Sequence, residues 1–323
     1  MDRPKISIIG AGQVGSETAR VLATKRLGRY VLVDKREGLA KGRALDISHI
    51  DELGLSENDI QGSEDLAAIA GSDIVVVTAG YPRKKGMSRE DLLSINLEVI
   101  SEISEKIQTH APEAVIIMVT NPLDAMTYAA WRLSGFHWNK VIGMAGALDA
   151  SRFAYYIARE AGVNPADVSP QVLGSHGQQM VPLVSNTSIG GMPVKSLLTA
   201  DQLQRAIGQT IDAGNELVSL LQTGSAFFAA SRAVASVVEA IVSDSKKIVN
   251  CSTLSQAHYD LDRVYIGLPV VLGKQGVERI ISLDLSEEEY RQLQDAASHL
   301  KTIQDKIEEC LVTSHITAKE TTT

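Results

Sequence analysis

The feature that most constrains the fold is a regular alternation of short apolar runs and longer amphipathic stretches in the first 146 residues. Apolar runs rich in Val, Ile and Leu, bounded by Gly, Asn or Asp, are typical of strands buried on both faces of a parallel sheet. The stretches between them space apolar residues three and four apart, which indicates crossover helices. The pattern predicts an α/β fold with a doubly wound, Rossmann-type parallel sheet that binds ligands at the carboxyl ends of its strands. The runs are KISIIG (5–10), YVLVD (30–34), DIVVVTAG (73–80), AVIIMVTN (114–121) and KVIGMAG (140–146).

The pattern changes after residue 146, where helical stretches mix with segments that resemble hairpins. Residues 181–194 contain the turn pair Gly190-Gly191, and residues 263–283 show the same hairpin pattern. Near the end, Ser286 and Glu289 form a capping-box pattern ahead of a long helical repeat. We expect two domains, residues 1–146 and residues 147–323, the second of α+β type.

Composition excludes several classes of partner. The 323-residue chain carries a formal net charge of −8, which argues against nucleic acid or an anionic membrane as its main partner. Its two cysteines, Cys251 and Cys310, have neither zinc-site spacing nor a disulfide framework. The N-terminus enters a strand pattern at once, and no apolar run approaches the roughly 20 residues that cross a bilayer. We therefore expect a cytoplasmic protein whose basic segments bind small anions.

A glycine-rich turn follows the first apolar run and opens the first helix. It reads G-x-G-x-x-G and consists of Gly10, Ala11, Gly12, Gln13, Val14 and Gly15. Asp34 ends the next strand, and this arrangement is the full dinucleotide fingerprint. The turn would hold a pyrophosphate at a helix N-terminus, while Asp34 would bind the adenosine ribose and repel a 2′-phosphate. We expect residues 1–146 to bind NAD in preference to NADP, although Lys35 and Arg36 beside Asp34 could weaken that preference.

A histidine among small residues is the candidate proton carrier. His176 lies in LGSHGQ between Ser175 and Gly177, and hydride transfer to or from an alcohol needs a group that exchanges the hydroxyl proton. A carboxylate should orient the imidazole, and Asp149 in ALDASRF can do so. If that segment is helical, Arg152 shares a face with Asp149 and offers two donors to a substrate carboxylate. These three residues predict a catalytic site in residues 147–323.

Five motifs occur in an order that is similar to the lactate/malate dehydrogenase family along essentially the whole chain. They are the glycine fingerprint, the basic run with Arg83 and Arg89, TNPLDAM (120–126), LDASR (148–152) and GSHG (174–177). The details resemble the lactate-dehydrogenase-like malate dehydrogenases of bacteria and archaea. The resemblance implies reversible NAD-dependent oxidation of (S)-malate to oxaloacetate, a reaction of the tricarboxylic acid cycle.

The resemblance also implies a role for each site residue. His176 is the general acid/base, Asp149 orients it, and Arg152 grips the C1 carboxylate of the substrate. Arg89 polarises the reacting carbonyl, and Arg83 pairs with the second carboxylate, where lactate dehydrogenases carry an uncharged residue. Both arginines belong to a loop that closes over the substrate. The remaining implied positions are Asn121 for nicotinamide and substrate, Asn96 and Val119 along the cofactor path, and Thr78 to Gly80 near the adenosine half.

Three alternatives stay open from the sequence. The nearest is an L-lactate or broad-specificity 2-hydroxyacid dehydrogenase; the others are an NAD-dependent glycosidase and a catalytically silent NAD-binding regulator. One position departs from the family pattern, since Gln178 replaces the usual aspartate after His-Gly. The resemblance further implies a homodimer or homotetramer, with helical faces in residues 39–50 and 226–242 as candidate contacts, no metal, and a small dicarboxylate as the ligand.

Overall fold

The structure is a computed structural model that describes residues 3–55, 59–82, 87–222, 224 and 226–320. Its strands are β1 (Lys5–Ile9), β2 (Arg29–Val33), β3 (Ile60–Ser63), β4 (Ile74–Val77), β5 (Val115–Met118), β6 (Val141–Gly143), β7 (Val168–Ser169), β8 (Val172–Gly174), β9 (Met180–Pro182), β10 (Ser188–Ile189), β11 (Met192–Pro193), β12 (Lys247–Leu254), β13 (Tyr265–Gly273) and β14 (Gly276–Ile280). Its helices are α1 (Gln13–Lys25), α2 (Leu39–Ser48), α3 (Arg89–His110), α4 (Leu123–Ser134), α5 (Ala145–Ala161), α6 (Ala200–Leu221), α7 (Phe228–Val242) and α8 (Glu287–Glu320).

The first six strands form the predicted parallel sheet. Their order is β3-β2-β1-β4-β5-β6, and every neighbouring pair in this half is parallel. The order reverses between β1 and β4, which is where doubly wound sheets bind nucleotides. The α/β fold class predicted from the sequence is confirmed.

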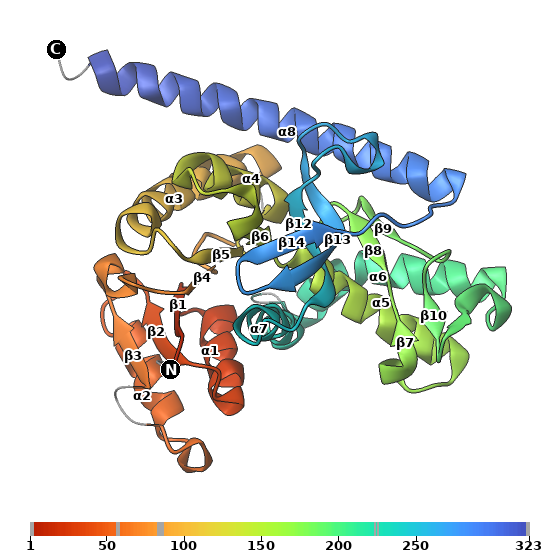
Figure 1. Cartoon of the computed structure of the whole chain (residues 1–323), viewed down its shortest axis with the longest axis horizontal. Helices are drawn as coiled ribbons and strands as arrows, with labels where there is room; N and C mark the ends of the chain where they lie inside the picture. Colours follow the sequence, from red (N-terminus) through yellow and green to blue (C-terminus); the bar gives the residue numbers. More distant parts are fainter. Residues whose placement is uncertain (1–2, 56–58, 83–86, 223, 225, 321–323) are drawn as a thin grey trace.

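Both faces of this sheet are covered, which explains why its strands are apolar throughout. In β4, Ile74 and Val76 belong to one apolar core, while Val75 and Val77 belong to the other, as the two-residue period of a strand requires. Helices α1 and α7 pack together on one face and α3 and α4 on the other (Figure 1). Since helices cover both faces, a ligand site can form at the carboxyl ends of the strands.

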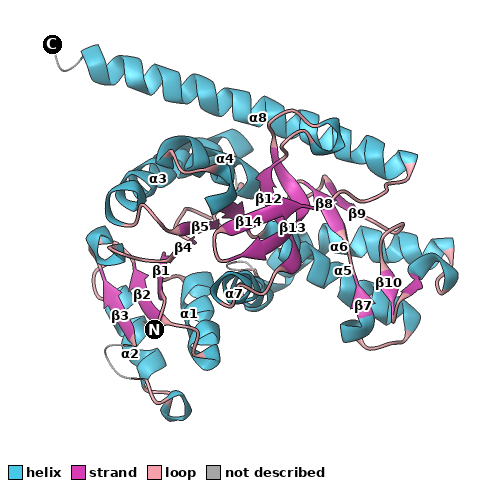
Figure 2. Ribbon diagram, in the orientation of Figure 1, coloured by secondary structure: helices cyan, strands magenta, loops and turns pink. Residues whose placement is uncertain are grey.

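The sheet continues beyond β6 into the second half of the chain. Strand β12 lies antiparallel to β6 through the pair Ser252 and Gly143, and β13, β8 and β9 follow (Figure 2). The predicted hairpins are present as β10–β11, which turns at Gly190-Gly191, and as β13–β14. Helices α5 and α6 enclose a separate third core. The two halves of the chain, whose sequences show different patterns of apolar residues, thus contribute strands to one sheet.

Helix α8 begins at the predicted capping box and runs along the molecule, and its end extends past the body (Figure 1). The backbone N–H of Ser286 donates to Glu289, and the N–H of Glu289 donates to the Ser286 hydroxyl. Leu293, Leu300 and Ile307 are buried, as their helical spacing predicts. Within the described residues, no helix has the length and apolar character that crossing a membrane would require.

Candidate active site

The glycine-rich turn is shaped by two close approaches. Gly10 has φ of 104°, and a Cβ there would lie 2.6 Å from the Ala79 nitrogen. A Cβ on Gly15 would lie 1.8 Å from the Gly10 carbonyl oxygen. Only glycine allows α1 to begin this close to β1 and β4.

The N-terminus of α1 is open to an anion. Its N-cap, Gly12, supplies no side chain, the first turn contains no acidic residue, and a Cβ built on Gly12 would meet no described atom within 4 Å. Helix N-termini of this kind present backbone N–H groups and a partial positive charge. Gln13 and Val14 follow in the first turn, so the predicted fingerprint residues fit a pyrophosphate.

Asp34 lies at the carboxyl end of β2, beside the glycine turn. Its side chain is 9% exposed, and Oδ2 accepts a hydrogen bond of 2.9 Å from the Ala11 N–H. Arg36 forms a two-pronged ion pair with the same carboxylate. The adjacent strand end is tied to the turn through Thr78, whose hydroxyl donates to the Gly10 carbonyl at 2.9 Å.

Asn96 is fully buried, and its side-chain amide is used within the protein. Its Oδ1 accepts from the Tyr81 N–H at 2.7 Å, and its Nδ2 donates to the Asn121 carbonyl at 2.7 Å. Asn96 therefore lies behind the strand ends and holds the segment after Gly80 against the end of β5. Val119 continues β5 through a 2.9 Å bond from its N–H to the Val77 carbonyl, and Asn121 is exposed beyond it.

The structure brings the predicted catalytic residues together. His176 follows β8, and its Nδ1 lies 2.8 Å from Asp149 Oδ2. Asp149 is on α5, as is Arg152, whose Nη1 lies 3.5 Å from Asp149 Oδ1. The LDASR segment is helical, which is the condition under which Asp149 and Arg152 were expected to share a face. Because Nδ1 faces a carboxylate, Nε2 is left as the nitrogen that can exchange a proton with a substrate.

The environment of His176 favours its charged form. Burial alone would lower the pKa of His176, but the charge and hydrogen bond of Asp149, together with the charge of Asp124, raise that pKa above its ordinary value. The His176 side chain is 18% exposed, whereas that of Asp149 is 3% exposed. The imidazole is therefore the more accessible member of the pair, and the buried carboxylate favours its protonated form.

One residue that holds the loop carrying His176 was not predicted from the sequence. Asp124, on α4, accepts a 2.8 Å hydrogen bond from the backbone N–H of His176 and a 3.1 Å bond from the Ser175 hydroxyl. It is 3% exposed, and burial raises its pKa. A carboxylate inside the apolar helix LDAMTYAAW was the available signal, since a buried carboxylate needs nearby donors. Asp124 links the cofactor half of the chain to the histidine loop.

The basic run is only partly within the described residues. Arg83, with residues 84–86, lies outside them, so the predicted second carboxylate contact is not seen. Arg89 is the first residue of α3, which is capped by Ser88 and Asp91, and nothing is described of its side chain. Gln178 is exposed, and its amide nitrogen lies 3.5 Å from a backbone carbonyl of α6.

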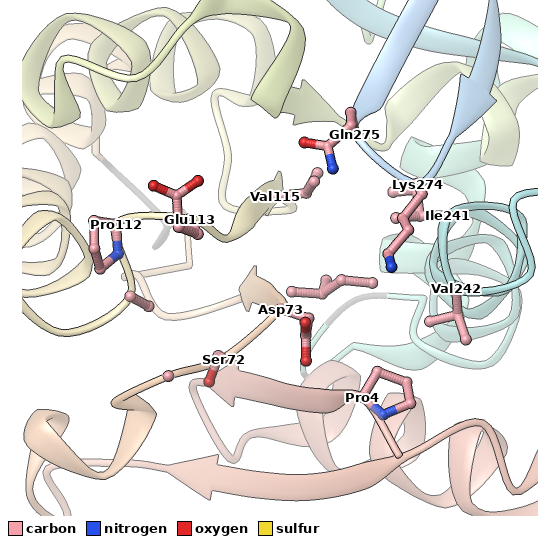
Figure 3. A pocket seen from close by; sticks show the side chains of 13 residues that line it. Pro4, Ser72, Asp73, Pro112, Glu113, Val115, Ile241, Val242, Lys274 and Gln275 are labelled. Carbon is pink, nitrogen blue, oxygen red and sulfur yellow. The ribbon is translucent and has the colours of Figure 1, made fainter. Parts of the chain in front are cut away.

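A cavity of about 430 Å³ lies at the amino ends of the strands, where β1, β4 and β5 begin (Figure 3). Its carboxylates already have protein partners: Asp73 accepts the Lys5 N–H at 2.8 Å, and Glu113 pairs with Lys140 at 3.0 Å. None of the predicted site residues lines it. The candidate active site is therefore the group of residues at the carboxyl ends of the strands.

Comparison with known proteins finds a family match for each half of the chain. Residues 4–143 match the model of the lactate/malate dehydrogenase NAD-binding domain, and residues 146–311 match the model of the α/β C-terminal domain of the same family. Malate dehydrogenase 1 of Anaeromyxobacter dehalogenans (strain 2CP-C) is 43% identical over 301 residues, which cover 93% of this chain and 96% of that protein.

Two solved structures are equally similar although their names differ. The malate dehydrogenase of Cryptosporidium parvum and the lactate dehydrogenase of the same organism, solved with lactic acid and nicotinamide adenine dinucleotide, each superpose with a TM-score of 0.91 at 38% identity. Each match covers 95% of this chain and 99% of the other. The fold alone therefore does not separate the two activities. Both halves of the sequence, the strand order and the solved relatives agree that this chain belongs to the lactate/malate dehydrogenase family.

Proposed function

We propose that the protein is an NAD-dependent malate dehydrogenase that interconverts (S)-malate and oxaloacetate. The observation that carries the proposal is the arrangement of His176, Asp149 and Arg152 in a chain whose glycine turn is shaped for a pyrophosphate. The cofactor supplies the acceptor for the hydride from C2 of malate. The chain's own residues must bind the diacid, exchange one proton and exclude water.

His176 takes the hydroxyl proton of malate at Nε2 and returns it to the ketone oxygen in the reverse direction. Asp149 holds the imidazole by Nδ1 and stabilises the imidazolium. Asp124 fixes the backbone of the same loop, so the ring is positioned from two sides. Arg152, whose side chain is 13% exposed, would bind the C1 carboxylate with its planar donors. Asn121, exposed after β5, would contact the nicotinamide and the substrate oxygen.

Substrate choice is assigned to Arg83, with Arg89 polarising the carbonyl. The guanidinium of Arg83 would pair with the second carboxylate of oxaloacetate, which pyruvate lacks. The malate dehydrogenase name of the bacterial relative supports this assignment. Ala226, where lactate dehydrogenases usually carry Thr, is consistent with it.

The remaining assignments are part of the same proposal. Residues 1–146 bind the dinucleotide, and residues 147–323 supply the catalytic groups, which is supported by the two family matches. The working form is a cytoplasmic homodimer or homotetramer that serves the tricarboxylic acid cycle. Of the two proposed contact helices, α7 is largely buried within this chain, while α2 exposes Leu45 at 57%.

The test is steady-state kinetics of Arg83→Gln with NADH. Loss of a bidentate charged partner costs about 2–5 kcal/mol, so kcat/KM for oxaloacetate should fall by about 30-fold or more while pyruvate turnover improves. Lys84→Gln, which removes one charge from the same run, is the matched control and should change neither. Unchanged oxaloacetate kinetics in Arg83→Gln would refute the role. A wild-type protein that prefers pyruvate would favour the lactate dehydrogenase alternative.

A further inference from the structure

The carboxylate that should receive the adenosine ribose is already fully bonded. An ionised carboxylate offers about four acceptor sites, and Asp34 receives four donors. Oδ1 accepts from the Arg36 backbone N–H at 3.0 Å and from Arg36 Nε at 2.9 Å. Oδ2 accepts from the Ala11 N–H and from Arg36 Nη2, both at 2.9 Å. A ribose hydroxyl can bind Asp34 only if a guanidinium hydrogen bond gives way.

The surface at this strand end is therefore cationic rather than anionic. The Asp34 side chain is 9% exposed, whereas that of Arg36 is 63% exposed and covers it. Burial works to raise the pKa of Asp34, but the Arg36 and Ala11 hydrogen bonds lower it overall, so the ion pair stays formed at neutral pH. Lys35 lies next to this pair, with its Nζ 5.7 Å from the Tyr81 ring centroid. The three residues Asp34, Lys35 and Arg36 sum to one positive charge.

We propose that Arg36 is a specificity-determining residue that lets this site bind NADP as well as NAD. The proposal rests on the assignment of Asp34 to the adenosine ribose made above. A lone aspartate at this position repels a 2′-phosphate, whereas a nearby arginine accommodates one. Arg36 cancels the charge of Asp34, and its exposed fork can turn from the carboxylate to a phosphate, which suits the same planar geometry.

Binding calorimetry with NADH, NADPH and 2′,5′-ADP tests the proposal without reliance on turnover. The variants are Arg36→Leu, which leaves Asp34 its two backbone donors, and Arg36→Lys, which keeps the charge but not the fork. Arg20→Leu is the matched control, because Arg20 makes the same two-pronged contact with Glu17 on the exposed side of α1. Turnover of oxaloacetate with each cofactor is a second readout.

The wild type should bind NADPH within about a hundredfold of NADH, since one bidentate charged contact with phosphate is worth roughly 1.5–3 kcal/mol, or about 10- to 150-fold. Arg36→Leu should weaken NADPH and 2′,5′-ADP by at least about tenfold while NADH changes less than about threefold, with Arg36→Lys between them. Arg20→Leu should alter none of the three.

A wild-type gap between NADPH and NADH affinity larger than about a hundredfold, or an Arg36→Leu variant that changes the ratio of NADPH to NADH affinity by less than about threefold, would overturn the inference. The proposed function would survive either result. A protein that binds none of the three ligands would instead contradict the assignment of the dinucleotide site itself, and the proposed function with it.

Discussion

Replacing Asp149 by Asn tests the proton carrier directly. The substitution keeps the shape of the side chain but removes the charge that lies 2.8 Å from His176 Nδ1. The site is protected from solvent, with Asp149 3% exposed, so screening by water is weak. A hydrogen bond between charged groups in such a place contributes about 1.5–3 kcal/mol. Since one pKa unit corresponds to about 1.4 kcal/mol, the pKa of His176 should fall by roughly 1–2 units in the variant.

The sign of the pH effect follows from the raised pKa of His176 in the wild type. In the proposed mechanism, reduction of oxaloacetate needs the protonated ring, so kcat/KM for oxaloacetate should decline as pH rises through this pKa. Oxidation of malate needs the neutral ring, so its kcat/KM increases through the same pKa. In Asp149→Asn both limbs should move to lower pH, and kcat/KM for oxaloacetate at neutral pH should fall by about 10- to 150-fold.

The assay is a pair of pH–rate profiles, one for each direction, measured by NADH absorbance. Asp295→Asn, at an exposed carboxylate paired with Arg291 on α8, is the matched control and should leave both profiles in place. If both limbs of Asp149→Asn stay within about 0.3 pH unit of the wild type, the coupling between Asp149 and His176 is absent and the mechanism fails. If only one limb moves, the limb that stays in place reports the titration of another group.

Two further predictions concern the glycine turn and the start of α8. Gly12→Ala should weaken NADH binding by at least about tenfold while the free energy of unfolding changes by less than about 1 kcal/mol, because its Cβ meets no described atom but fills the space through which the pyrophosphate approaches. Gly15→Ala should instead destabilise the fold. Binding calorimetry measures the effect on NADH affinity, and urea titration measures the effect on stability. Glu289→Gln should cost about 1–3 kcal/mol at pH 7, because the Glu289 carboxylate accepts from Ser185 and Ser286. The pKa of Glu289 is lowered in the fold. The difference in unfolding free energy between wild type and variant should therefore be complete at pH values above the ordinary glutamate pKa, and it should disappear as pH falls through the lowered pKa of the folded state. Urea titrations at several pH values would show this dependence.

Local chemistry made much of the cofactor half predictable. Strands buried on both faces leave an unbroken apolar signature, and the turn at Gly10 needs glycine for its positive φ whatever lies elsewhere. The shared face of Asp149 and Arg152 followed from their spacing on the condition that their segment is helical, since i and i+3 positions share a face in any helix.

Contacts between distant segments were not predictable in this way. Asp124 meets the backbone of His176 from 52 residues away, and its role depends on how α4 packs beside the loop after β8. Arg36 is adjacent to Asp34 in sequence, yet adjacency does not show that the guanidinium covers both carboxylate oxygens. The antiparallel pairing of β12 with β6 also depends on tertiary packing rather than on either strand's own pattern.

The pairing of Gly143 with Ser252 joins the nucleotide half and the histidine half into one continuous hydrogen-bonded sheet. Because the two halves share one sheet, they cannot rotate apart as two domains joined only by a hinge do. We therefore expect the spacing between a bound nicotinamide and the His176 imidazole to be set by the backbone register of this sheet and to change little when ligands bind. Any motion that seals a diacid from water must originate in segments outside this sheet, so structures solved with and without substrate should superpose across both halves.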